Sequence, residues 1–231
     1  MVSTVTIALP DDLDDRDKIE DDQSPNYLFT APGDIVAQIK PMPASTCHDY
    51  RLKPGAYSVV RSISGDFVIP FDFNHGPVIV SPDSPADQIA KFLEQQFSAK
   101  VQDRLRAYGE IVKAGVLLYG PGGTGKSYTI YAAVAAAIAK GWIVLVEPSP
   151  GVTDEWIDLI RNMRDQPDDQ PIMIVWEELD TRMVRYRDSL LNLLDGKNSR
   201  ENVVVLATTN HINEIPATFT SRPSRFGKII E

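Results

Sequence analysis

The sequence has very few cysteines and histidines. Its 231 residues include a single cysteine, Cys47, which cannot form an internal disulfide. A disulfide-stabilised framework is therefore excluded, and the composition fits a reducing compartment. The histidines, His48, His75 and His211, are too scattered to predict a metal site. The sequence also lacks a signal-peptide pattern and an apolar run of about 18 residues, which predicts a soluble cytoplasmic protein without a membrane segment.

Basic residues are outnumbered by acidic ones, 23 against 32, and the formal net charge is -9. A surface of this average sign repels nucleic acid and anionic lipid, although a local basic channel could still exist. Nucleic acid is therefore not the expected partner. With 43% hydrophobic residues, the chain is long enough for one sizeable core, or for one core and a small satellite domain.

Composition along the chain predicts three parts. Residues 1–25 contain the acidic stretch "PDDLDDRDKIEDDQSP" without apolar periodicity, which indicates a disordered tail. We interpret it as a solvated spacer rather than as an acidic docking arm. Residues 26–83 contain short β-branched and aromatic runs broken by turn formers, typical of a small β-rich N-terminal domain. Residues 84–231 form the third part.

The third part alternates between helical and strand patterns. It opens with Ser84 and Asp87 at capping-box spacing, followed by apolar residues at helical intervals. Then come apolar strand runs separated by helices: "AGVLLYG", "WIVLVEP", "PIMIVWEE" and "NVVVLATTN". Continuous apolar strands between helices predict an α/β fold, a parallel sheet with helices on both faces.

A glycine-rich loop lies between the first of these strands and an alanine-rich helix. The stretch "GPGGTGKS", Gly120 to Ser127, matches G-x-x-x-x-G-K-[ST] in the position that a phosphate-binding loop requires. Its backbone N–H groups and the following helix N-terminus would hold phosphates, Lys126 would lie along the β- and γ-phosphates, and Ser127 would bind Mg²⁺. The predicted ATP-binding residues are Gly120, Pro121, Gly122, Gly123, Thr124, Gly125, Lys126, Ser127 and Tyr128.

Two adjacent glutamates follow the strand in "IMIVWEELD". Ionised carboxylates at the end of a buried strand need a positive partner. The carboxyl ends of parallel strands lie at one end of the sheet, so Lys126 and the Mg²⁺ of a bound nucleotide would supply that charge. One carboxylate can serve the metal while the other deprotonates the attacking water. Which of Glu177 and Glu178 takes which role stays open at this point, and a structural carboxylate pair is the alternative.

Three further residues are candidates for catalysis. Asn210 ends the strand "VVVLATTN", where an amide could orient the attacking water, although asparagine at a strand end is often only a turn former. His211 beside it is interpreted as a surface residue. Arg222 and Arg225 flank a Pro-Ser turn, and are either arginine fingers that act in trans or surface arginines.

The chain resembles an AAA+ ATPase of the AAA clade over residues 85–231. Five blocks carry the resemblance: "GVLLYGPGGTGKS", "IMIVWEELD", "LLDG", "VVVLATTN" and "SRPSRFGKII". It implies Walker A at Gly120 to Ser127, Walker B at Ile172 to Glu178, sensor 1 at Asn210 and arginine fingers at Arg222 and Arg225. Within Walker B, it implies that Glu177 serves the metal and that Glu178 is the base. It also implies ATP and Mg²⁺ as ligands and a homo-oligomeric ring, commonly a hexamer. Within the clade, the motifs "LLNLLDG" and "TTNH" are most similar to those of the subgroup that includes the mitochondrial respiratory-complex assembly chaperone.

Four features depart from the family pattern. Glu177 replaces the usual aspartate, and Gly122 stands where the loop usually has a second proline, which should loosen it slightly. The aromatic-hydrophobic-glycine pore loop is not evident in "EPSPGVTDEWIDL". The family's helical lid and sensor 2 arginine are absent from the 231 residues, which indicates a truncated form, a fragment of a longer product or a lidless member. We expect weaker nucleotide retention than in a complete module.

The predicted function is therefore that of an ATP hydrolase that remodels a protein client as a ring. Two alternatives stay open at this point. One is a nucleic-acid-associated ATPase, such as a helicase loader or a packaging ATPase, which the acidic composition disfavours. The other is a structural ring that binds ATP and barely hydrolyses it.

Overall fold

The computed structural model describes residues 26–27, 37–39, 41–42, 52–62, 65–72, 78–149, 153–163, 170–195, 200–222 and 224–231. The tail predicted for residues 1–25 lies outside these residues, as does much of the predicted N-terminal β-rich domain. The described part of that domain includes β1 (Asn26–Tyr27) and β3 (Pro41–Met42), which form a two-stranded antiparallel sheet. The division of the chain into three parts stays a prediction.

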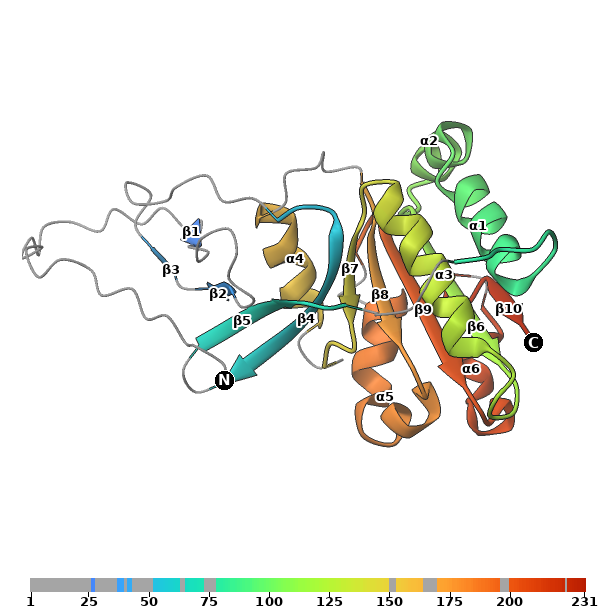
Figure 1. The fold of residues 1–231 in the computed structure, drawn as a ribbon. Coiled ribbons are helices and arrows are strands. Elements are labelled where there is room, and N and C mark those ends of the chain that lie inside the picture. Colours follow the sequence, from blue (N-terminus) through green and yellow to red (C-terminus); the bar gives the residue numbers. More distant parts are fainter. Residues whose placement is uncertain are drawn as a thin grey trace, which may run out of the picture.

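An eight-stranded sheet organises the described chain, in the order β10-β6-β9-β8-β7-β4-β5-β2 (Figure 1). All pairs from β10 to β4 are parallel, whereas β5 and β2 add antiparallel pairs at one side. The strands are β2 (Ala37–Ile39), β4 (Gly55–Ser62), β5 (Gly65–Pro70), β6 (Lys113–Tyr119), β7 (Ile143–Val146), β8 (Ile172–Trp176), β9 (Val203–Thr209) and β10 (Lys228–Ile230).

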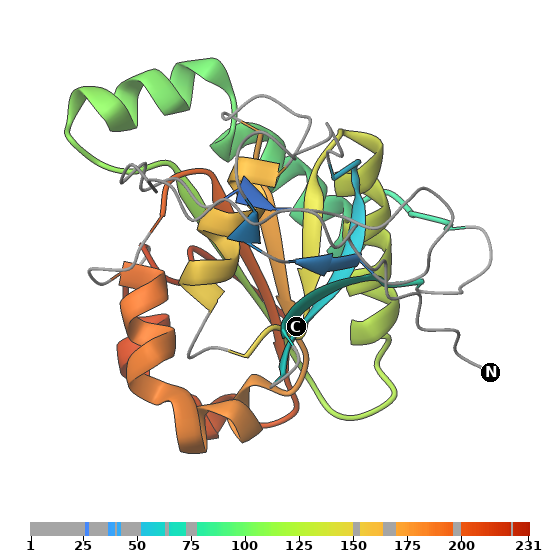
Figure 2. The same cartoon turned by 90° about the vertical axis from the view of Figure 1, so that its left-hand side faces the viewer.

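The helices cover both faces of this sheet, as the sequence predicts. They are α1 (Pro85–Gln96), α2 (Ala99–Ala107), α3 (Lys126–Ala139), α4 (Thr153–Met163), α5 (Leu179–Asp195) and the short α6 (Ala217–Thr220), with a 3₁₀ turn η3 (Ile212–Glu214). Figure 2 shows α4 and α5 on one face and α3 on the other. The fold is therefore the α/β fold of a P-loop NTPase.

Each face has its own apolar core. On one side, Trp156 and Ile160 of α4 and Leu190 of α5 pack against β8 and β9. On the other, Ile89 of α1 and Ile130 of α3 pack against alternate residues of the same strands. Every residue of β8 and β9 is buried, which explains why these strands are continuous apolar runs rather than alternating ones.

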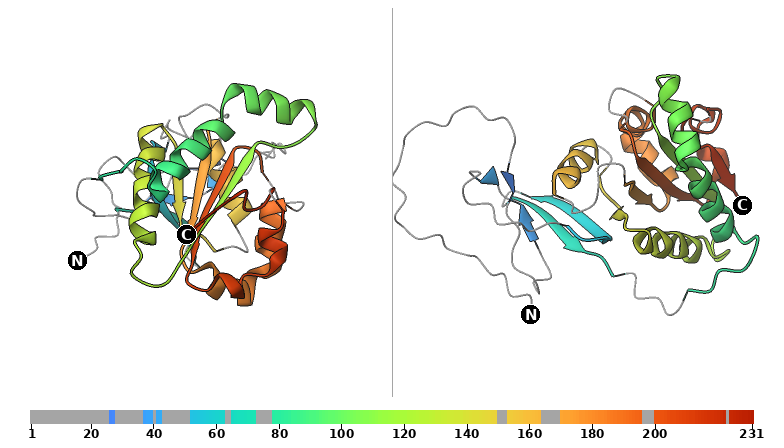
Figure 3. Two further views of the ribbon diagram at one scale, coloured as in Figure 1. Left: turned by 90° about the vertical axis from the view of Figure 1, so that its right-hand side faces the viewer. Right: turned by 90° about the horizontal axis from the view of Figure 1, so that it is seen from above.

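The predicted helix that starts near Ser84 is two helices. The Ser84 hydroxyl accepts a hydrogen bond from the Asp87 N–H at 3.3 Å, and Pro85 occupies the first turn, so the predicted cap is confirmed. The helix ends at Gln96, and α2 restarts after Ser98, as Figure 3 shows from above. α2 has no buried residue, so no packing holds it in line with α1.

Helix α5 begins earlier than the pattern "YRDSLLNLLDGK" indicates. It starts at Leu179, directly after the paired glutamates, and Leu179 and Met183 are buried one turn apart. Tyr186, where the sequence pattern starts, has non-helical φ and ψ of -121° and 21°. The helical pattern is interrupted at this kink, so the first two turns of α5 were missed.

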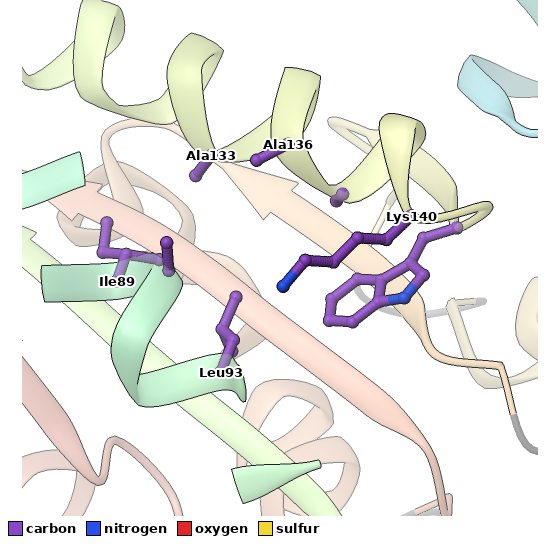
Figure 4. A pocket seen from close by; sticks show the side chains of 8 residues that line it. Ile89, Leu93, Ala133, Ala136 and Lys140 are labelled. Atoms are coloured by element: carbon purple, nitrogen blue, oxygen red, sulfur yellow. The ribbon is translucent and has the colours of Figure 1, made fainter. Parts of the chain in front are cut away.

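A small apolar cavity of about 20 Å³ lies between α1 and α3. Ile89 and Leu93 of α1 lie across from Ala133 and Ala136 of α3, with Lys140 at one side (Figure 4). Trp142 also lines the cavity. Its lining has no carboxylate or hydroxyl, and it lies apart from the glycine-rich loop, so it reflects the packing of small residues rather than a reactive site. In the described part of the chain, no helix combines the length and apolar character needed to span a bilayer.

Candidate active site

Four loops meet where the parallel strands end, which we call the carboxyl end of the sheet. They follow β6, β7, β8 and β9, and they contain the glycine-rich loop, Glu147, the paired glutamates and Asn210. These four strands are consecutive in the sheet, in the order β6-β9-β8-β7, so segments distant in the sequence converge. The opposite end, where the strands begin, is called the amino end below.

The glycine-rich loop takes the backbone path that its glycines permit. Gly120, Gly123 and Gly125 have φ values of 150°, 82° and 89°, a region in which other residues are strained. Gly125 also precedes the first turn of α3, so the helix N-terminus points into the loop. Gly122 lies outside this region and has no heavy atom within 4 Å of the position where its Cβ would be.

Lys126 folds over the inside of the loop. Its ammonium donates hydrogen bonds to the carbonyl oxygens of Gly120 at 2.6 Å and Pro121 at 2.8 Å. The Thr124 hydroxyl donates to the same Pro121 oxygen at 2.9 Å. A cation and a helix N-terminus therefore meet in one loop, which is the arrangement that binds phosphate groups.

Ser127 and Glu177 are in direct contact. The serine hydroxyl donates to Glu177 Oε2 at 2.6 Å, across 50 positions of sequence. The two residues predicted to serve the metal thus lie side by side, one from each motif. A hydroxyl and a carboxylate oxygen are ligands of the kind that Mg²⁺ takes in proteins.

Glu178 differs from Glu177 in backbone and in exposure. Its φ of 51° is left-handed, and its side chain is exposed, whereas that of Glu177 is half-buried. The Glu178 N–H donates to the Thr208 hydroxyl at 3.1 Å, which links this residue to β9. The two carboxylates therefore lie in different environments, and their separate roles stay a prediction.

Two threonines of β9 make contacts that the sequence did not indicate. Besides Thr208, the buried Thr209 hydroxyl donates to Asp180 Oδ1 at 2.7 Å and accepts from the His211 N–H at 3.0 Å. Asn210 follows directly, half-buried, at the carboxyl end of β9. The predicted position of Asn210 at this end is confirmed, while its role stays a prediction.

Glu147 and Arg182 are further neighbours of Glu177 that the sequence analysis missed. Glu147 Oε1 accepts from the Glu177 N–H at 2.6 Å, and Glu147 Oε2 is ion-paired with the Arg182 guanidinium. Burial lowers the pKa of Arg182. Neither residue belongs to a recognisable motif, so only their proximity in the fold could have found them.

Tyr128 links the glycine-rich loop to a distant segment. Its hydroxyl accepts from the Ile79 N–H at 2.8 Å and donates to the Ile79 carbonyl at 3.0 Å. The chain just before α1 is thus held beside the first turn of α3. Tyr128 was predicted to bind nucleotide, and this contact was not predicted.

Arg222 and Arg225 lie at the amino end of the sheet, far from the glycine-rich loop of the same chain. Arg222 donates to Asp195 Oδ2 at 3.2 Å, and Arg225 lies 3.5 Å from the same oxygen. Asp195 also pairs with Lys113, the first residue of β6. The seven residues of β6 span about 20 Å, so the arginines cannot reach the loop that follows this strand.

Asp195 is the shared acceptor of these cations. Burial by itself raises the pKa of Asp195, but the hydrogen bond from Arg222 and the charges of Lys113 and Arg225 outweigh it and lower this pKa below its usual value. The Arg222 side chain is 64% exposed and that of Arg225 is 12% exposed. Arg222 is therefore the one available to another molecule.

Within the residues that the structure describes, no group of three or more His, Cys, Asp or Glu is arranged to hold a metal ion. A Mg²⁺ bound together with phosphates and water needs only one or two protein oxygens, so it does not require such a group.

Comparison with known proteins places these features in a family. Residues 116–231 match the family model of the "ATPase family associated with various cellular activities (AAA)". This stretch includes the glycine-rich loop, the paired glutamates, Asn210 and both arginines.

Curated relatives agree with this match. The chain is 36% identical over 133 residues to the ATPase family gene 2 protein of Schizosaccharomyces pombe, covering 51% of this chain and 16% of that protein. It is 31% identical over 131 residues to the protein CdcH of Halobacterium salinarum, covering 51% and 17%. It is 28% identical over 178 residues to the proteasome-activating nucleotidase 1 of Haloferax volcanii, covering 65% and 43%. The chain therefore spans less than half the length of each of these relatives.

Proposed function

Because the chain belongs to the AAA family of ATPases, we propose that it binds and hydrolyses ATP at the carboxyl end of its sheet and uses hydrolysis to remodel a protein client. The observation that supports this best is the 2.6 Å hydrogen bond between Ser127 and Glu177. This bond places the phosphate-binding loop beside the carboxylates that follow β8, and ATP hydrolysis needs both in one site.

The phosphates of ATP bind to the glycine-rich loop. Backbone N–H groups and the α3 N-terminus surround them, and the Lys126 ammonium exchanges its carbonyl partners for the β- and γ-phosphate oxygens. This exchange replaces two neutral acceptors with charged ones, which makes the hydrogen bonds stronger. Ser127 and Glu177 would hold Mg²⁺, which when bound neutralises charge on the β- and γ-phosphates.

Glu178 is the general base of the proposed reaction. Its exposed carboxylate accepts a proton from a water molecule, and the water oxygen forms a bond to the γ-phosphorus. The bond from this phosphorus to the oxygen shared with the β-phosphate breaks, and ADP leaves with that oxygen. Asn210 orients the water molecule through its amide.

The two arginines act on the site of a neighbouring subunit. They lie at the amino end of their own sheet, so they support catalysis only if a second copy places its phosphate loop next to them. A homo-oligomeric ring, of hexamer-like size, provides this arrangement around every site. Arg222 then stabilises the negative charge that develops on the γ-phosphate.

A protein client is favoured over nucleic acid because the net charge is -9. The name of the relative from Haloferax volcanii, a proteasome-activating nucleotidase, refers to a protein assembly and is consistent with this choice. Location in the cytoplasm stays a prediction.

The test is the variant Glu178→Gln, which removes the base and keeps the shape of the side chain. We expect ATP binding to be retained and turnover to fall roughly 10²- to 10⁴-fold. Binding is measured with a fluorescent ATP analogue, turnover by phosphate release, and oligomeric mass by light scattering with and without ATP.

Glu94→Gln, on the exposed surface of α1, is the matched control and should keep full turnover. Unchanged turnover in Glu178→Gln would remove Glu178 from this role. An ATP-dependent ring in the unaltered protein with almost no phosphate release would favour the structural ring instead.

A further inference from the structure

The last link between β7 and β8 is made by a side chain. The Glu147 N–H donates to the Val175 carbonyl at 2.9 Å, as parallel pairing requires. In such a ladder the next bond would run from the Glu177 N–H to the main-chain carbonyl of Glu147. The Glu177 N–H donates instead to the Glu147 carboxylate, at 2.6 Å.

The backbone of Glu147 explains the replacement. Its φ of 56° is left-handed, which is unfavourable for a residue with a long side chain. This conformation turns the Glu147 carbonyl out of the ladder, and the carboxylate takes its place. Backbone strain of this kind persists where surrounding contacts enforce it, and it is concentrated at functional sites.

Arg182 completes the arrangement from the opposite side. Its Nε donates to the Glu177 carbonyl at 3.5 Å, and its guanidinium is ion-paired with Glu147. The Glu177 peptide is therefore held at its N–H by Glu147 and at its C=O by Arg182. The two side chains that hold it are bound to each other, and both are half-buried, with 34% of Glu147 and 25% of Arg182 exposed.

We propose that Glu147 and Arg182 are positioning residues for the carboxylate of Glu177. They fix its peptide on both sides and so direct Oε2 toward Ser127. A glutamate has one more rotatable bond than an aspartate, so the position of its carboxylate depends more strongly on a fixed backbone. The proposal rests on the proposed function, in which Ser127 and Glu177 hold Mg²⁺.

The test compares nucleotide affinity with and without Mg²⁺. The probe is a fluorescent ATP analogue, titrated in excess Mg²⁺ and in EDTA. The ratio of the two dissociation constants gives the increase in affinity due to Mg²⁺, which is called the gain below. We expect Glu147→Gln and Arg182→Gln to reduce this gain about tenfold while affinity in EDTA changes less than twofold. The double variant should lose no more than the worse single variant, because both residues act through one peptide.

Two further variants separate positioning from general damage. Arg187→Gln removes an exposed arginine of the same helix and should keep the gain. Arg182→Lys keeps the charge and should retain more of the gain than Arg182→Gln. If Glu147→Gln does not fold, the comparison of Arg182→Lys with Arg182→Gln still decides.

The proposal is overturned if the single variants keep the gain, or if they lose affinity equally in Mg²⁺ and in EDTA. The unaltered protein separates this outcome from failure of the proposed function. If it binds no nucleotide, or gains nothing from Mg²⁺, the proposed function itself is wrong and the positioning role is overturned with it.

Discussion

The two ends of the sheet differ in the balance and the arrangement of their charges. At the carboxyl end, three carboxylates, Glu147, Glu177 and Glu178, lie around the phosphate loop with Lys126 and Arg182. The contacts of Glu177 with Ser127 and Glu147, and of Glu178 with Thr208, join residues of different strands or loops. The charges at this end are therefore carried by several side chains, each at its own position around the loop.

At the amino end, the balance is reversed. One carboxylate, Asp195, is shared by Lys113, Arg222 and Arg225, and the most exposed of these cations is Arg222. The cluster around Asp195 has more cations than carboxylates and the group around the phosphate loop has more carboxylates than cations, so the two clusters are complementary in charge. In the proposed ring, these two ends are the two halves of one site, which neighbouring copies of the chain bring together.

The largest expected effect is at the amino end. Arg222→Ala should lower turnover about 10³-fold and leave ATP binding unchanged, because in the proposed ring this arginine acts on the site of a neighbouring subunit. Turnover by phosphate release and binding of a fluorescent ATP analogue measure the two quantities. Arg104→Ala, an exposed arginine of α2, is the control and should remain active.

Mixing subunits tests whether the two ends cooperate in trans. Arg222→Ala subunits retain Glu178, and Glu178→Gln subunits retain Arg222, so a mixture forms some complete sites although each variant alone forms none. Activity should therefore reappear on mixing. A mixture as inactive as its components would refute the complementarity of the two ends.

A smaller effect is expected from Gly115→Ala in β6. The added Cβ would lie 1.7 Å from the Arg225 carbonyl oxygen, so the segment with both arginines must move. We expect the free energy of unfolding in urea to fall by roughly 1–3 kcal/mol. Gly122→Ala is the matched control at the carboxyl end, with no heavy atom within 4 Å, and should keep or slightly raise stability. Equal effects of the two substitutions would contradict the close contact at Gly115.

The smallest effect concerns Asp195 and pH. Its pKa is lowered in the folded protein, so its contribution to stability is complete above the unfolded value of about 3.9 and is lost as the pH falls through the lower folded value. Asp195→Asn should therefore lower the free energy of unfolding by about 1–2 kcal/mol at pH 7. The difference in free energy of unfolding between Asp195→Asn and the unaltered protein should disappear as the pH falls below about 4. A difference independent of pH, measured by urea unfolding across this range, would show that the charge of Asp195 is not the cause.

Local sequence patterns, together with the parallel arrangement of the strands, were sufficient to predict two parts of the site. The glycine-rich loop between β6 and α3 follows from its own residues, since glycine permits the positive φ values and the helix begins at Lys126. The contact between Ser127 and Glu177 was also predictable, because parallel strands bring their carboxyl ends together.

The remaining contacts depend on conformations that no short pattern specifies. Glu147 acts through a left-handed backbone and a partner 30 positions away, and a glutamate after a strand gives no sign of either. Thr208 and Thr209 appear as ordinary strand residues until β9 is paired beside β8. The break between α1 and α2 was hidden because apolar periodicity continues across it, although α2 buries nothing.

The position of β6 also has a consequence for biosynthesis. This strand leads into the phosphate loop, yet both of its neighbours in the sheet, β9 and β10, come from the far end of the described chain. While the chain emerges from the ribosome, an apolar strand buried on both faces in the folded protein has neither edge paired. The nascent chain must keep this segment from aggregating until residues 203–230 have been made.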